Sequence, residues 1–216
     1  MSLFQGRKIP VAALVFIVVV LAATFIDPAA GRMSWLLENL PGIVFVVVML
    51  ALGRRFPFSD LVWINAAIHV VILAYGGFYT YAETPLGNWA KEAFDLSRNH
   101  YDRVGHLALG FFPAIVAREV LLRASPLRRG FWLAFIVVNI CNSIGAFWEL
   151  IEWWTTLVVA GDVGVAFLGA QGDIWDAQWD MFLVLLGSIL GLLVLSRAHD
   201  RSLAKLEATR AASVQA

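Results

Sequence analysis

Residues 171–195, with the sequence QGDIWDAQWDMFLVLLGSILGLLVL, join an acidic start to a long apolar run. About 20 predominantly apolar residues are enough to cross the hydrocarbon core of a bilayer as a helix. A spacing of three and then four residues puts the aspartates on one helix face, and two glycines continue the same stripe. The stripe consists of Asp173, Asp176, Asp180, Gly187 and Gly191. The segment therefore predicts a membrane-spanning helix. One face of this helix carries aspartates at its start and glycines deeper in the membrane, where another helix can approach closely.

Further apolar runs precede this one, and the whole chain is unusually apolar. Hydrophobic residues make up 60% of the 216 residues, charged residues make up 15%, and the mean hydropathy is +0.76. Soluble domains average roughly 45–50% apolar and about 25% charged residues, and a soluble fold of this size has too little interior for the difference. The sequence predicts an all-α, six-span transmembrane bundle with no soluble catalytic domain. The expected spans are Ile9–Ile26, Ser34–Leu52, Leu61–Thr80, Val104–Leu122, Phe131–Val159 and Ile174–Leu195.

Two of these spans leave an alternative open. Glu38 precedes the clean apolar stretch of the second span, which begins only at Pro41, so this segment could also be re-entrant. The first span follows Arg7 and Lys8, as the apolar region of a signal peptide does. We expect an uncleaved first span, because five more spans follow and its removal would leave an odd number.

The basic residues predict the orientation. Cytoplasmic loops of membrane proteins carry an excess of Lys and Arg. With a cytoplasmic N-terminus, the cytoplasmic side would hold Arg7, Lys8, Arg54, Arg55, Arg118, Arg123, Arg128, Arg129, Arg197, Arg201, Lys205 and Arg210, and the outer side would hold Arg32, Lys91, Arg98 and Arg103. Both chain ends are therefore expected in the cytoplasm. We predict a transmembrane domain over residues 1–196 and a basic cytoplasmic tail over residues 197–216, as a solvated helix or a frayed end.

Ionisable residues recur at one level of three predicted spans. Asp102 and His106 are four residues apart and share a helix face at the start of the fourth span. Glu149 and Glu152 lie near the outer end of the fifth span, level with the aspartates that open the sixth. A charged group within a membrane costs free energy, and such groups usually face away from lipid. We therefore predict one pocket near the outer leaflet, where Asn65, His69 and Tyr75 of the third span could form another wall.

The expected roles follow from the residue types. Several carboxylates in a small volume repel one another and call for protons, a basic partner or a cation. Oxygen ligands with one imidazole suit Mg²⁺, Mn²⁺ or Ca²⁺, or a zinc ion, although the H-E-x-x-H zinc motif is absent from the sequence. We assign His106, Glu149 and Glu152 to general acid–base catalysis, Asp173, Asp176 and Asp180 to a divalent cation, and Asp102, Arg103 and Gln171 to substrate binding.

Several of these residues also have structural explanations. Asp173 could cap a helix N-terminus, Asp102 and Arg103 could form a surface ion pair, and His69 could be a packing residue. Three functions stay open: an enzyme or binding protein for an envelope lipid or other amphiphile, a proton- or cation-coupled transporter, and a structural subunit. The transporter hypothesis rests on polar residues that extend toward the middle of the membrane, namely Asn65, His69, Asn139 and Asn142.

Other classes of function are excluded by composition. The 16 basic and 16 acidic residues cancel, so we expect no nucleic-acid partner. Cys141 is the single cysteine and rules out an intramolecular disulfide and a zinc–thiolate cluster. The expected partners are the lipid bilayer and a lipid-like small molecule, and the oligomeric state stays open.

Three strings carry a resemblance to a known family: YDRVGH at residues 101–106, ELIEW at residues 149–153 and QGDIWDAQWDM at residues 171–181. They resemble the shared motifs of the YjdF-like bacterial inner membrane proteins, and the resemblance runs from the first span to the sixth. More distantly, the D-R-x-x-H opening and the spaced aspartates are similar to VanZ-type membrane proteins. The resemblance implies a multi-pass inner membrane protein and supplies no reaction, substrate or catalytic residue.

Overall fold

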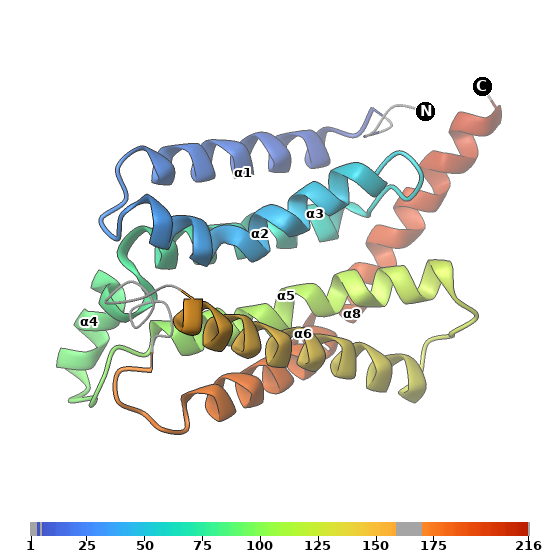
Figure 1. Ribbon diagram of the computed structural model, residues 1–216. Helices are drawn as coiled ribbons and strands as arrows, with labels where there is room; N and C mark the ends of the chain where they lie inside the picture. Colours follow the sequence, from blue (N-terminus) through green and yellow to red (C-terminus); the bar gives the residue numbers. More distant parts are fainter. Residues whose placement is uncertain (1–3, 5, 159–169, 216) are drawn as a thin grey trace.

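The structure is a computed structural model that describes residue 4 and residues 6–158 and 170–215. All regular structure in these residues is helical, in seven α-helices and one short 3₁₀ helix that form a bundle (Figure 1). The helices are α1 (Lys8–Ile26), α2 (Arg32–Leu52), α3 (Asp60–Tyr79), η1 (Tyr81–Glu83), α4 (Pro85–Ala93), α5 (Tyr101–Ala124), α6 (Phe131–Val158) and α8 (Asp176–Gln215). Val159 and Ala216, the predicted ends of the fifth span and of the tail, lie outside the described residues.

The long helices match the first five predicted spans to within a few residues, and α8 begins near the predicted start of the sixth but extends well beyond its predicted end. Helices α1, α2, α3, α6 and α8 are long and apolar enough to cross a membrane. Helix α2 runs unbroken past Pro41. Helix α5 is not among these five helices, yet it lies inside the bundle against α3, α6 and α8. The prediction of an all-α membrane bundle is thereby confirmed for the described residues.

Helices α5 and α8 form the closest pair, because glycine lets their backbones touch. A Cβ atom at Gly187 would overlap the carbonyl oxygen of Leu107, and one at Gly191 would overlap the carbonyl oxygen of Phe111. From the other side, a Cβ atom at Gly110 would overlap the carbonyl oxygen of Val184. The glycine stripe predicted for the last span is therefore the surface that packs on α5.

The two ends of the bundle can be named by one residue each. At the Asp60 end, Arg7 before α1 contacts Asp60 at 2.9 Å, and Lys205 of α8 contacts the other oxygen of the same carboxylate at 3.6 Å. Helices α1 and α3 begin there, and α5 ends there. At the opposite end, which we name after Asp102, α5 and α8 begin and α6 ends (Figure 1). The start of α1 and the last turns of α8 thus lie at the same end of the bundle.

Helix α8 continues without interruption across the predicted boundary between residues 196 and 197. Beyond that boundary His199, Leu203 and Leu206 are buried. Ser202 accepts a hydrogen bond from the Leu61 backbone N–H at 3.0 Å, in the first turn of α3. This part of the predicted tail is therefore packed against the bundle.

The α5–α8 contact generates a first prediction. Gly187→Leu should lower the free energy of unfolding by about 1–3 kcal/mol, because an added side chain has no space beside the Leu107 carbonyl group. Thermal unfolding of the detergent-solubilised protein measures the loss. Leu193→Ala, at a position of the same helix that is 75% exposed, is the matched control and should change the melting temperature little. Equal melting temperatures for both variants would contradict the assigned contact.

Candidate functional site

The centre of the candidate site consists of Asp102, His106 and Asp180. One ligand atom from each of these side chains lies within 4.8 Å of the other two. Asp102 and His106 are one turn apart on α5, with 3.5 Å between Asp102 Oδ1 and His106 Nε2. Asp180 enters from α8, and all three residues are buried. The close approach of α5 and α8 is what brings the three side chains together.

A third helix supplies a carboxylate to the other side of the imidazole. Glu149 Oε1 of α6 lies 3.3 Å from His106 Nδ1. The His106 side chain is only 4% exposed, and that of Glu149 is 10% exposed. His106 therefore has a carboxylate beside each ring nitrogen. The prediction that α5, α6 and α8 turn ionisable residues toward one another agrees with this arrangement.

A small cavity adjoins the cluster. Its polar lining consists of Glu38, Tyr81, Asp102, His106 and Glu152, and its apolar lining includes Leu73, Leu109 and Trp148. Its volume of about 20 Å³ is enough for a single water molecule or a bare cation. A phosphate group or a lipid headgroup does not fit into this volume.

Within the described ranges, the carboxylates in and around this cavity outnumber the basic side chains that form ion pairs with them. Five carboxylic residues, Glu38, Asp102, Glu149, Glu152 and Asp180, belong to the cavity or to the cluster around His106. Asp180 Oδ1 is buried without a hydrogen-bond partner among the described residues, and the contact of His106 Nδ1 with Glu149 Oε1 lacks the geometry of a hydrogen bond. Buried polar atoms are nearly always satisfied in proteins. The donor set thus suits an additional positive charge, either a proton or a metal cation.

Tyr81 closes one side of the cavity. Its ring lies between two glycines, because a Cβ atom on either Gly76 of α3 or Gly105 of α5 would come within 2.6 Å of a ring carbon. Burial, with the charge of Glu38 adding to it, raises the pKa of the Tyr81 phenol well above its usual range. The phenol therefore stays neutral and can donate its O–H.

Asp173 and Asp176, two of the predicted metal ligands, form ion pairs with arginines. Arg103 contacts Asp173 at 2.8 Å, and Arg98 forms an ion pair with Asp176. Arg98 also donates to the Ala170 carbonyl oxygen at 2.9 Å. We call these four side chains, Arg98, Arg103, Asp173 and Asp176, the arginine clamp. It joins the start of α5 and the preceding loop to the start of α8, beside the cavity and outside its lining.

Gln171 holds the same two segments together. Its side chain accepts from the Asn99 N–H at 3.1 Å and donates to the Asn99 carbonyl oxygen at 2.8 Å. The Asn99 amide in turn donates to the Thr84 carbonyl oxygen and to Asn88 of α4. Gln171 therefore joins the loop before α5 to the loop before α8.

The predicted wall of α3 lies elsewhere. Tyr75 accepts a hydrogen bond from the Leu86 N–H at 3.0 Å, and His69 stacks on Phe112 with ring centroids 5.5 Å apart. Neither residue, nor Asn65, is among the residues that line the cavity. Helix α3 contributes Leu73 to the cavity lining, and Glu38 of α2 adds a carboxylate that was not predicted there.

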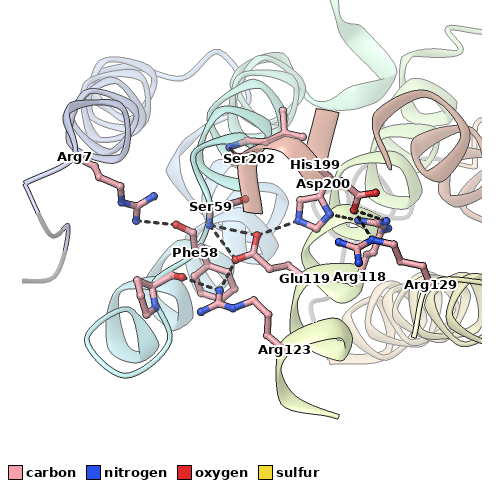
Figure 2. A network of polar contacts seen from close by, with 12 residues as sticks. Arg7, Phe58, Ser59, Arg118, Glu119, Arg123, Arg129, His199, Asp200 and Ser202 are labelled. Atoms are coloured by element: carbon pink, nitrogen blue, oxygen red, sulfur yellow. Dashed lines mark hydrogen bonds and ion pairs between the residues drawn. The ribbon is translucent and has the colours of Figure 1, made fainter. Parts of the chain in front are cut away.

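A second buried polar network holds the Asp60 end of the bundle (Figure 2). Glu119 of α5 accepts from the Ser59 N–H at 2.9 Å and contacts Arg123 at 2.6 Å. His199 of α8 lies 3.1 Å from Glu119 and 2.6 Å from Arg118. A guanidinium can only donate, so His199 Nδ1 must accept, and the proton on Nε2 then points to Glu119. In this network, unlike the cluster around His106, each carboxylate has basic partners.

The sequence contained signals for some of the residues that were missed. Glu119 and Arg123 are four residues apart, the spacing of a helical ion pair. Glu38 is a carboxylate at the start of an apolar span, as Asp102 is, but we interpreted it only as a weakness of that span. No pattern indicated Arg98 as the partner of Asp176, because Arg98 lies in the loop before α5.

Apolar helices around a buried cluster of carboxylates and one histidine define this chain as a polytopic helical membrane protein with an internal ionisable site. The chain belongs to the family described as "Predicted membrane protein (DUF2238)", whose model matches residues 9–201. It is 43% identical over 175 residues to the inner membrane protein YjdF of Escherichia coli (strain K12), which covers 81% of this chain and 83% of that protein. No solved structure matches the chain. The protein is accordingly a protein of the bacterial inner membrane.

The second network generates a prediction of its own. Glu119→Ala leaves Arg123 and His199 buried without their partner and should lower the free energy of unfolding by about 3–5 kcal/mol. Arg129→Ala is the matched control, because Arg129 contacts Asp200 of the same network with a side chain that is 60% exposed. Chemical or thermal unfolding in detergent should separate the two variants clearly. Similar stabilities would show that the buried contacts at the Asp60 end contribute little.

Proposed function

We propose that this inner membrane protein binds a single divalent cation between Asp102, His106 and Asp180. The supporting observation is the convergence of three ligand atoms within 4.8 Å from two helices. One imidazole with carboxylate oxygens is a donor set for Zn²⁺ or Mn²⁺, whereas Mg²⁺ and Ca²⁺ prefer oxygen ligands alone. Glu149 beside His106 adds a further carboxylate and helps to offset the charge of the ion.

The proposal gives the predicted catalytic residues narrower roles. A bound cation acidifies a coordinated water molecule and polarises an ester or phosphoryl oxygen. His106 would then hold the ion, and Glu149 would be the group that accepts a proton from the water. Glu152 lines the adjoining cavity, where it would meet whatever enters.

An envelope lipid or other amphiphile is the substrate class that the location near one membrane surface favours. The cavity of about 20 Å³ does not accommodate its headgroup. Lipid processing therefore requires that Tyr81 or the arginine clamp move away from the site. We accordingly place cation binding first and treat the amphiphile as the class of molecule on which the ion would act.

Transport is a weaker proposal than cation binding. Asn65 and His69 do keep buried atoms without hydrogen-bond partners among the described residues. Asn139, however, is exposed on the outside of α6, so it adds nothing to an internal polar route. At least one of the four polar residues that were expected to lead toward mid-membrane therefore faces away from the interior of the bundle.

We further propose six membrane crossings, formed by α1, α2, α3, α6 and α8 together with α5. Both chain ends would then lie in the cytoplasm. The contacts of Arg7 and Lys205 with Asp60 support an even number of crossings, because they bring the start of α1 and the end of α8 to one end of the bundle. The excess of basic residues at that end supports the cytoplasmic side. The cation site would then lie near the outer surface.

The orientation can be measured with reporter fusions. Green fluorescent protein fused after residue 216 should fluoresce, and alkaline phosphatase fused there should be inactive. Alkaline phosphatase fused after a truncation at Asp95, in the loop before α5, should be active. The opposite pattern at either position would overturn the proposed orientation.

Cation binding predicts a specific pattern among three variants. After removal of bound metal with a chelator, the purified protein should take up about one Zn²⁺ or Mn²⁺ ion per chain. His106→Ala and Asp180→Asn should weaken binding at least tenfold, because each removes a ligand. Asp173→Asn should bind normally, because Asp173 is paired with Arg103 outside the cavity.

Isothermal titration calorimetry and metal analysis after gel filtration measure the binding. Unchanged binding in both ligand variants, or no binding by the wild type, would overturn the proposal. If His106→Ala and Asp180→Asn instead fail to fold while the wild type binds no metal, the cluster would serve only to hold the helices together.

A further inference from the structure

The outward face of α6 carries two polar residues amid aromatic ones. Phe135, Asn139, Ser143 and Phe147 follow one another at intervals of four residues and are all exposed. They surround a shallow hollow of about 490 Å³ that is otherwise lined by Ile136, Ile140 and Ile144. The opposite side of α6 packs on α8, where a Cβ atom at Gly145 would crowd the Val184 side chain. We call the four-residue stripe the α6 outer face.

The polar groups of this face are only partly satisfied. Asn139 donates one amide hydrogen to the Phe135 carbonyl oxygen at 2.8 Å, and the Ser143 hydroxyl donates to the Asn139 carbonyl oxygen at 2.8 Å. Within the described residues no donor is found for the side-chain oxygen of Asn139. The second amide hydrogen is also left over. Because α6 is long and apolar enough to cross the membrane, these groups face hydrocarbon, which can neither donate nor accept.

We propose that the α6 outer face docks against the same face of a second copy of this chain. An amide is both donor and acceptor, so Asn139 can pair with its own symmetry mate across a two-fold axis. Both copies have the same orientation in the membrane, so their α6 helices lie parallel and equal residues meet at the axis. The hollow between Phe135 and Phe147 leaves space for the approaching helix.

A second copy fits this face better than lipid does. An acyl chain can fill the hollow but leaves the Asn139 amide without a partner, and amides on transmembrane helices pair across helix interfaces. The amide needs no complementary residue in another protein, because its own copy supplies the matching donor and acceptor. The dimer leaves the His106 cluster intact, because that cluster lies on the inward side of α6, α5 and α8.

Cysteine cross-linking in native membranes tests the arrangement. In a Cys141→Ser background, Ser143→Cys should form a covalent dimer on oxidation with copper phenanthroline. Leu193→Cys on α8, another exposed position with a residue that is 75% exposed, should not cross-link. Equal cross-linking at both positions would mean random collision and overturn the proposal, as would a Ser143→Cys chain that never cross-links.

The role of the amide is tested by a second variant. Asn139→Leu keeps an apolar helix and should weaken self-association at least tenfold, as measured by energy transfer between labelled chains in proteoliposomes. Val19→Leu, on the exposed side of α1, is the matched control and should associate as the wild type does. A monomeric wild type, or Asn139→Leu with unchanged association, would overturn the proposal. A different protein cross-linked to Ser143→Cys would replace the second copy as the occupant.

Discussion

The backbone contact between α5 and α8 is the constraint on which the rest of the structure depends. Three glycines, Gly110, Gly187 and Gly191, allow the helices to approach until one backbone touches the other. At such a separation, short side chains such as aspartate can reach across without bending either helix. The same pair of helices therefore carries an ionisable cluster at each end, and small residues occupy the space between them.

The two clusters differ in how their charges are balanced, and this difference is the basis on which we propose a cation site at only one of them. At the Asp60 end, Glu119 has Arg123, His199 and the Ser59 N–H as partners, so the network can hold helices together without any additional ligand. At the Asp102 end, Arg103 and Arg98 form ion pairs with Asp173 and Asp176, and in the described part of the chain the ion-pair contacts of Asp102 and Glu149 are with the His106 imidazole. A cluster of carboxylates without enough positive charge beside it costs free energy inside a membrane, which is a reason to expect a cation there.

Much of the fold could be predicted from the sequence, because apolar length and helical spacing are local properties. The starts of the six long helices and the glycine face follow from such properties, and so does the meeting of Asp102, His106, Glu149 and Asp180, whereas the unbroken continuation of α8 beyond residue 195 was not predicted. The division of the aspartates could not be predicted. Asp176 and Asp180 share a helix face, but Arg98 forms an ion pair with Asp176, and the position of a loop arginine depends on tertiary packing.

The same limit explains why Glu38 was misjudged. A carboxylate near the start of an apolar helix lowers the hydropathy of that span, so considered alone it argues against a crossing. Its burial beside the cavity depends on α2 lying against α3 near Tyr81, which no pattern within α2 encodes. A polar residue in an apolar helix can thus indicate either a segment that does not cross the membrane or a side chain that faces the interior of the bundle. Only the neighbouring helices decide between them, as they do for Asn139, whose amide faces outward.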